Sequence, residues 1–140
     1  MPEDEPNSST TGSSVVLAAV IERNGCFLIC QRPENKRHGL LWEFPGGKLE
    51  AGETFFQAAV RELEEELALH VTEVGSVCDA IVDPDSNFVI NFVAVEVVGE
   101  PVPLEHAAFD WLPIDKLLDL PLAPADRCFA EKLNNGSLHL

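Results

Sequence analysis

The chain has 140 residues, enough for one folded domain with a hydrophobic core and too few for two. It carries 9 Lys and Arg against 24 Asp and Glu, a formal charge of −15, and 46% of its residues are hydrophobic. A surface of this charge repels duplex nucleic acid and anionic membranes at long range. We see no apolar run near the roughly 20 residues of a membrane span and no signal-peptide pattern. We therefore expect a globular protein that binds neither duplex nucleic acid nor membrane.

The N-terminal half begins with residues 1–13, which are acidic, rich in Ser and Thr and poor in large apolar side chains. This composition predicts a disordered leader. Apolar and β-branched runs then predict three strands, at residues 14–22, 26–32 and 40–44. Asn24-Gly25 suits positive φ and predicts a hairpin turn between the first two strands. Residues 33–39 predict a basic loop before the third, and Pro45 ends that strand.

A helix is expected next, because Thr54 and Gln57 fit a capping box. It should begin at Thr54 and run to Leu67 or Leu69. Its apolar stripe is predicted from spacings of three and four residues: Phe56, Ala59, Val60, Leu63 and Leu67.

The C-terminal half predicts two long extended segments, at 71–83 and 88–98, the second of them central in its sheet. Shorter elements follow: a strand at 109–113, helices at 114–120 and 125–134, and a tail at 135–140. Strands before and after one helix, paired over long sequence separations, indicate a mixed α/β sandwich. We expect one domain at 14–134.

Cysteines occur four times, with no CxxC pair and no metal-ligand spacing: Cys26, Cys30, Cys78 and Cys128. Reduced, mostly buried thiols are the ordinary interpretation of such a pattern in a cytosolic protein. A cytoplasmic location is therefore expected, and the sequence leaves monomer and homodimer both open.

Three glutamates share one face of the predicted helix, because Glu62, Glu65 and Glu66 stand at i, i+3 and i+4. Like charges at this spacing cost a few tenths of a kcal/mol per pair, and the C-terminal end of a helix disfavours anions. Arg61 and Arg32 are expected to relieve part of the repulsion. Clustered carboxylates suit Mg²⁺ or Mn²⁺; a solvated acidic face is the alternative.

Glycines precede this helix and strengthen the functional interpretation. Gly46-Gly47, after Pro45, predicts a sharp turn that brings the backbone close to the glutamates, with a carbonyl available to a cation. Gly52 ends the loop just before the helix cap.

The spacing of these residues resembles the Nudix box of the Nudix hydrolases. The pattern is a Gly, five residues, a Glu, seven residues, Arg-Glu-Leu, one residue and Glu-Glu: Gly47, Glu53, Arg61, Glu62, Leu63, Glu65 and Glu66. One position departs, since Ala68 stands where the family usually has glycine. Alanine there is compatible with one more helical residue or with a different exit from the helix.

The likeness covers residues 15–134, and the segment LPLAPAD at 120–126 is similar to the branch that acts on CTP-type and oxidised nucleotides. The implied fold is the Nudix α/β/α sandwich with a mixed β-sheet. The implied activity is Mg²⁺-dependent hydrolysis of a nucleoside triphosphate to the monophosphate and pyrophosphate, with Mn²⁺ as the alternative ion.

The resemblance also implies roles for individual residues. The general base is left open between Glu65, Glu66 and Glu105, and Glu53 and Arg61 are organisers joined by an ion pair. The metal ligands are Gly46 through its carbonyl, Glu62, Glu65, Glu66 and Glu105. The substrate-binding residues are Arg32, Phe44, Lys48 and Asp126.

Each substrate-binding residue has an ordinary alternative. Arg32 and Lys48 are also expected as surface charges, Phe44 as a core aromatic, and Asp126 as a helix N-cap. The basic residues of the 33–39 loop are expected over the mouth of the site. His106, beside Glu105, is interpreted as a loop histidine without a ligand role.

The base preference rests on Asp126, because an ionised carboxylate only accepts hydrogen bonds. Guanine and 8-oxoguanine offer two adjacent donors, which favours 8-oxo-dGTP and a role in cleansing the nucleotide pool. CTP and 5-methyl-dCTP come next, followed by dinucleoside polyphosphates, ADP-ribose and capped RNA ends. A non-catalytic binding module on the same scaffold is the alternative of another class, and the presence of all three helix glutamates argues against it.

Overall fold

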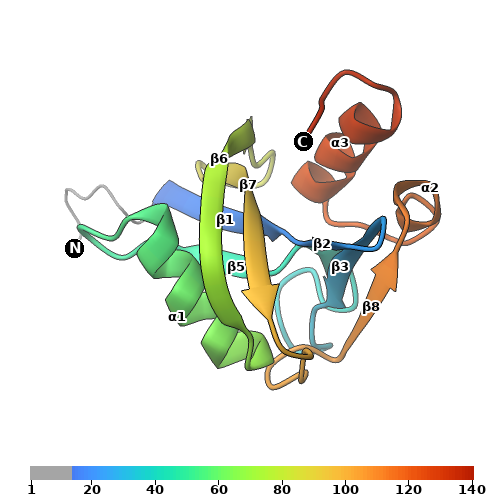
Figure 1. The fold of residues 1–140 in the computed structure, drawn as a ribbon. Coiled ribbons are helices and arrows are strands. Elements are labelled where there is room, and N and C mark those ends of the chain that lie inside the picture. Colours follow the sequence, from blue (N-terminus) through green and yellow to red (C-terminus); the bar gives the residue numbers. More distant parts are fainter. Residues whose placement is uncertain (1–13) are drawn as a thin grey trace.

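The computed structural model of the chain describes residues 14–140. The predicted disordered leader at 1–13 lies outside the described residues. Within the described range, eight strands form two sheets and three helices lie around them (Figure 1). The α/β prediction is confirmed.

The first sheet is mixed, as expected. Its order is β5 (Gly46–Lys48), β1 (Val15–Val20), β7 (Val89–Val98) and β6 (His70–Val82). The β1 strand runs antiparallel to β5 and parallel to β7, and β6 pairs with β7 in antiparallel register. The β7 strand is central, as predicted, whereas β5 was predicted as a turn. The two glycines of that segment are therefore part of a strand.

The second sheet was not anticipated. It contains β2 (Glu22–Arg23), β3 (Cys26–Gln31), β4 (Trp42–Glu43) and β8 (Ala108–Leu112), all antiparallel. The single strand predicted at 14–22 is divided at its end, so that β1 and β2 belong to different sheets. The predicted hairpin turn between β2 and β3 is confirmed, with both of its residues at positive φ.

The helices are α1 (Phe55–Leu67), α2 (Ile114–Leu117) and α3 (Pro124–Asn134). The capping box of α1 is confirmed, since Gln57 N donates to Thr54 Oγ1 at 3.1 Å and Thr54 N donates to Gln57 Oε1 at 2.9 Å. None of these helices is both long and apolar enough to cross a membrane.

The apolar stripe of α1 was predicted wrongly at one position. Phe56 is 47% exposed, whereas Ala58, which the prediction omitted, is fully buried. The buried side therefore turns toward Ala58, Ala59, Leu63 and Leu67.

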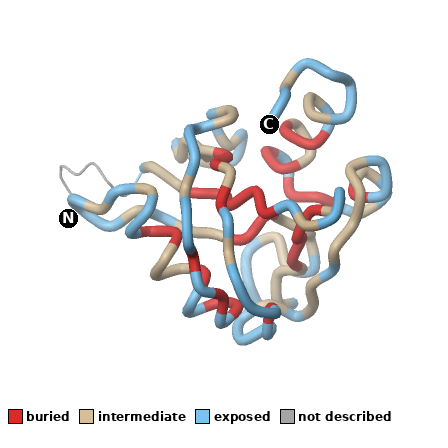
Figure 2. Tube along the Cα trace, viewed as in Figure 1, coloured by how far each residue is buried: buried red, intermediate tan, exposed pale blue. Residues whose placement is uncertain are grey.

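Two hydrophobic cores lie on opposite faces of the mixed sheet (Figure 2). Successive β1 side chains point to opposite faces, as strand geometry requires. Leu17 and Ala19 pack toward α1, and Ala18 and Val20 pack toward α3. The arrangement is the expected α/β/α sandwich, and the edge where β4 leads into β5 lies between its two cores.

The cysteines are all free. Only Cys30 is buried, and burial raises the pKa of its thiol. The other three are half-buried, so the prediction of mostly buried thiols is wrong.

Candidate active site

The α1 helix presents its glutamates at its C-terminal end and stops at Leu67. Ala68 takes the left-handed conformation, with φ 56° and ψ 32°, and its N–H donates to the Glu64 carbonyl at 3.1 Å. Of the two alternatives predicted for Ala68, the structure excludes one more helical residue, because Ala68 is already the C-cap. Alanine adopts the backbone geometry that glycine adopts without strain, so the exit from the helix is kept at a cost of about 1 kcal/mol.

The loop before β8 is attached to this helix end. The main-chain N–H groups of Val102 and Leu104 donate to carbonyl oxygens of the last two helical residues, at 2.8 and 3.0 Å. These donors satisfy groups that a helix C-terminus otherwise leaves without partners. The attachment places Glu105 and His106 beside Glu66, although the two segments are far apart in sequence.

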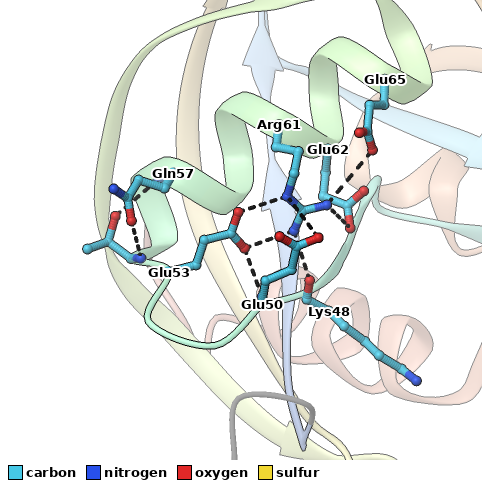
Figure 3. A network of polar contacts seen from close by, with 8 residues as sticks. Lys48, Glu50, Glu53, Gln57, Arg61, Glu62 and Glu65 are labelled. Atoms are coloured by element: carbon cyan, nitrogen blue, oxygen red, sulfur yellow. Dashed lines mark hydrogen bonds and ion pairs between the residues drawn. The ribbon is translucent and has the colours of Figure 1, made fainter.

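An ion pair joins the loop before α1 to the helix itself (Figure 3). Arg61 donates from Nε and Nη2 to the two carboxylate oxygens of Glu53, both at 2.8 Å, and from Nη2 to the Lys48 carbonyl at 3.1 Å. This two-point contact lowers the pKa of Glu53 to about 2. Arg61 Nη1 also lies 3.5 Å from Glu62 and 3.8 Å from Glu65. The predicted pair exists, and Arg61 partly compensates the acidic face.

The backbone at Gly47 lies directly against the carboxylate of Glu62. A Cβ atom at that position would overlap the Glu62 carboxylate. Glu62 and Glu66 are hydrogen-bonded to each other, and burial raises the pKa of both. Glu66 is only 7% exposed, and burial together with the charges of Glu62, Glu43 and Glu105 raises its pKa to about 9.

A small acidic cavity of about 170 Å³ opens beside Glu66. It is lined mainly by charged and polar groups, and its full lining is Arg32, Pro33, Lys36, Glu43, Gly46, Glu66, Glu105 and His106. Of the predicted metal ligands, Gly46, Glu66 and Glu105 meet here, and Glu62 adjoins them through Glu66. Glu65 does not line the cavity; its side chain is 55% exposed and turns toward Arg61.

The donor set of this acidic cavity suits a hard divalent cation, which binds carboxylate and carbonyl oxygens. Within residues 14–140, no three His, Cys, Asp or Glu side chains are grouped closely enough to hold a metal ion by themselves. Burial is the largest cause of the raised pKa of Glu66, and the negative charges of Glu62, Glu43 and Glu105 raise it further. Such an environment favours a bound cation.

Glu43 is a site residue that the sequence interpretation missed. Arg32 Nη1 lies 3.1 and 3.3 Å from its two oxygens, and His106 Nε2 lies 3.3 Å from one of them. Arg32 therefore pairs with Glu43, and its expected relief of the helix glutamates is wrong. The available signal was a single carboxylate within the otherwise apolar segment 40–44.

A second, larger cavity of about 370 Å³ adjoins the first and is called the apolar cavity below. It shares Arg32, Glu43 and Gly46 with the acidic cavity, and its own lining includes Phe44, Phe88, Ile90, Ala125 and Asp126. Phe44 is 3% exposed and packs edge-on against Phe92 and Phe129, with ring centroids 5.8 and 5.5 Å apart. Phe44 is thus both a core aromatic and part of a cavity wall.

Asp126 does not cap α3. The N-cap position is Ala123, and the Asp126 carboxyl instead accepts a hydrogen bond from Phe44 N at 2.9 Å. Asp126 is 5% exposed, and burial together with the nearby charge of Glu43 raises its pKa to about 8. The direction of this shift favours a protonated carboxyl, whereas the sequence prediction took Asp126 as an ionised acceptor.

Lys48, Arg37 and His38 line the apolar cavity, and Lys36 lines the acidic one. Lys48 Nζ stands 4.4 Å from the centre of the Phe88 ring. In the 33–39 loop, Arg37 donates to the Asp85 carbonyl at 3.1 Å, and His38 Nε2 lies 3.3 Å from the Asp85 carboxylate. Both loop residues line the apolar cavity, as the loop prediction required.

Comparisons with known proteins agree with this geometry. A family model described as NUDIX domain matches residues 11–133. The chain is 42% identical over 114 residues to the CTP pyrophosphohydrolase of Escherichia coli K12, covering 79% of this chain and 84% of that protein. It is 37% identical over 82 residues to an 8-oxo-dGTP diphosphatase of Proteus vulgaris, covering 58% and 73%. The crystal structure of a MutT Nudix hydrolase from Burkholderia pseudomallei superposes with a TM-score of 0.74 at 27% identity, covering 86% and 97%. The chain therefore belongs to the Nudix hydrolase family and is a pyrophosphohydrolase that acts on nucleotides.

Proposed function

We propose that the protein hydrolyses nucleoside triphosphates to the monophosphate and pyrophosphate, with Mg²⁺ as cofactor and Mn²⁺ as a substitute. One observation carries the proposal: the apolar and the acidic cavity share a wall made by Arg32, Glu43 and Gly46. A nucleotide has a flat, largely apolar base at one end and a polyanion at the other. Such a molecule fits a site in which the apolar cavity receives the base and the acidic cavity, with a bound cation, receives the phosphates.

The triphosphate half requires positive charge, because the substrate and the carboxylates repel each other. A divalent cation, typical of the family, would neutralise this charge and lower the pKa of a bound water. We propose that the residues that would hold it are Gly46 through its carbonyl, Glu62, Glu65, Glu66 and Glu105.

The protein's own groups have further proposed roles. Glu66, Glu65 and Glu105 are the candidates for the base that accepts a proton from the attacking water. Glu53 and Arg61 hold the loop and the helix in register through their two short hydrogen bonds.

The nucleotide itself would meet four residues. We propose that Arg32 and Lys48 contact phosphate oxygens and that Phe44 and Asp126 contact the base. All four line the apolar cavity, and Arg32 also lines the acidic one.

For the base, a protonated Asp126 supports cytosine as the first candidate. Its O–H can donate to cytosine N3 while its other oxygen accepts from the N4 amino group. The 42% identity to a CTP pyrophosphohydrolase points the same way. 8-Oxoguanine is second, because its O6 and N1–H also match a carboxylic acid, and the Proteus relative is an 8-oxo-dGTP diphosphatase.

This reaction is proposed to take place in the cytoplasm, in keeping with four free thiols. Its role would be to remove modified nucleotides before a polymerase uses them. Monomer and homodimer both stay predictions, which sedimentation equilibrium of the purified protein would decide.

The test is a substrate panel with pyrophosphate detection. Purified protein with MgCl₂ is given CTP, dCTP, 5-methyl-dCTP, 8-oxo-dGTP, dGTP, ADP-ribose and a dinucleoside polyphosphate. We expect kcat/KM to be highest for a cytosine nucleotide and the rate to vanish with EDTA. Higher kcat/KM for 8-oxo-dGTP would reverse the order of the two candidates. Undiminished turnover with EDTA, or turnover of ADP-ribose alone, would refute the proposal.

A further inference from the structure

His106 has no part in the reaction as described, yet it is one of the most enclosed side chains of the acidic cavity. Its side chain is 5% exposed. Its Nε2 atom lies 3.3 Å from Glu43 Oε2 and 3.7 Å from Glu66 Oε1. Its Nδ1 atom is buried without a hydrogen-bond partner among the described residues.

The chemistry of this contact determines which ring nitrogen carries the hydrogen. Ionised carboxylates only accept hydrogen bonds, and a neutral imidazole has one N–H and one bare nitrogen. The nitrogen that faces Glu43 must therefore be the N–H. The absence of a partner at Nδ1 agrees with this tautomer, because no acceptor in residues 14–140 is hydrogen-bonded to that nitrogen.

The consequence concerns Glu43, which is held from two sides. Arg32 contacts it with Nη1 at 3.1 and 3.3 Å, and His106 contacts it at 3.3 Å. Without the imidazole, the Glu43 carboxylate would keep only its contact with Arg32. The ring nitrogen that lies between it and the Glu66 carboxyl would be lost, and Arg32 alone would orient the Glu43 side chain.

We propose that His106 is a positioning residue whose Nε2–H holds Glu43 against Arg32 and so fixes the wall between the apolar and the acidic cavity. The inference rests on the proposed function, because the wall matters only if a nucleotide spans both cavities. The position of the loop does not depend on the imidazole, since the N–H groups of Val102 and Leu104 attach it to α1 independently.

The first test uses variants of His106 with the best nucleotide of the panel and Mg²⁺. Leucine removes the donor, glutamine places an N–H near the Nε2 position, and asparagine is too short to reach it. We expect His106→Leu to lower kcat/KM by about 10- to 100-fold, as is typical when a partner of a site residue is lost. His106→Gln should recover most of this loss and His106→Asn little of it. His70→Leu, at an exposed histidine on β6, is the control and should match the wild type.

The second test is a double-mutant cycle with Glu43→Leu. If His106 acts through Glu43, the His106→Leu change should have little further effect on kcat/KM in the Glu43→Leu background. Additive losses would overturn the proposal, as would wild-type kcat/KM in His106→Leu. Recovery by asparagine equal to that by glutamine would overturn it as well.

A readout without turnover separates this inference from the proposed function. In ¹⁵N-histidine spectra of the metal-free protein, His106 should be the Nε2–H tautomer in the wild type, and its signal should shift in Glu43→Leu. The same cycle measured on urea midpoints should be non-additive. A wild type that hydrolyses no nucleotide would refute the function while these two readouts still decide the contact. An Nδ1–H tautomer, or additive midpoints, would refute the contact in a fully active enzyme.

Discussion

The acidic cavity and the apolar cavity share three residues, yet they are built in different ways. On the acidic side, Glu62, Glu65 and Glu66 stand on one helix at spacings of three and four residues, and Arg61 and Glu53 tie this helix to the loop before it (Figure 3). Of these three glutamates only Glu66 lines the acidic cavity, where Glu43 of β4 and Glu105 of the loop before β8 join it. The apolar cavity is assembled from β1, β7, the β4–β5 segment and α3, which meet only in the folded chain (Figure 1).

The difference is also electrostatic. On the acidic side, carboxyl groups crowd together and burial raises the pKa of Glu66 to about 9. On the apolar side, a single buried carboxyl, Asp126, has its pKa raised to about 8. The acidic side favours a bound cation. The apolar side favours a protonated carboxyl, which we propose forms hydrogen bonds with a neutral base. Substitutions that affect only one side can separate the two halves.

The largest effect is expected from Glu66→Gln, which changes the acidic side alone. Pyrophosphate release should fall by about 100-fold or more, because a metal-held charge contributes several kcal/mol to the transition state. The midpoint of thermal unfolding should not fall, since a neutral isostere removes a buried, mutually repelling carboxyl. Glu64→Gln, at an exposed position of the same helix, is the control. A fully active Glu66→Gln enzyme would contradict the assignment.

The adjacent glycines should respond differently to alanine. In Gly47→Ala the new Cβ meets the end of the Glu62 side chain, which can move, so activity should drop by about tenfold while stability changes little. In Gly46→Ala the Cβ meets the Leu17 carbonyl, which belongs to the neighbouring strand and cannot move away freely. The free energy of unfolding should therefore fall by about 2 kcal/mol. Urea unfolding and pyrophosphate release measure the two effects. The reverse pattern would show that Glu62 is not constrained by position 47.

On the apolar side, Asp126→Asn should change the pH dependence of stability. The folded carboxyl keeps its proton up to pH about 8, whereas an unfolded aspartic acid releases it near pH 4. The folded state therefore binds more protons in this window, and its stability falls as pH rises, by up to about 1.4 kcal/mol per pH unit. The variant should lose this slope in urea titrations between pH 4 and 8. Parallel curves for both proteins would contradict a raised pKa.

The smallest effect is expected from Ala68→Gly, at the end of α1 and outside both cavities. Glycine adopts the left-handed conformation without the Cβ penalty, so the free energy of unfolding should rise by about 1 kcal/mol. Turnover should stay at the wild-type level, because the last-turn carbonyls keep their partners in the 102–104 loop. A loss of stability would indicate that alanine is favoured there by contacts other than its backbone.

Elements with a local cause were predicted well. The capping box, the helix, the shared face of its glutamates and the Glu53–Arg61 pair all follow from spacings of a few residues. The hairpin at Asn24-Gly25 follows from the positive φ that these residues tolerate. Phe56 was wrongly included in the apolar stripe of α1. An apolar residue near the start of a helix is not required to face the core, and local spacing alone does not show that it is exposed.

Elements that depend on distant partners were missed or misjudged. The β5 strand needs β1 as its neighbour, and nothing within residues 46–48 distinguishes it from a turn. Glu43 and His106 are 63 residues apart, and each looks ordinary in its own segment. Asp126 was predicted at the base site, and it lines the apolar cavity, but its hydrogen bond to Phe44 spans 82 positions and no local pattern indicates it.

The amino-acid sequence by itself determined the acidic helix and its partners, because the 3.6-residue turn places residues three and four apart on one face whatever the rest of the chain does. Only the tertiary structure decided which carboxyl groups are buried and therefore have raised pKa values. It also decided that Arg32 pairs with Glu43 and that His106 lies between Glu43 and Glu66. Burial and through-space charge depend on segments brought together from across the chain, and no local pattern records which segments will meet.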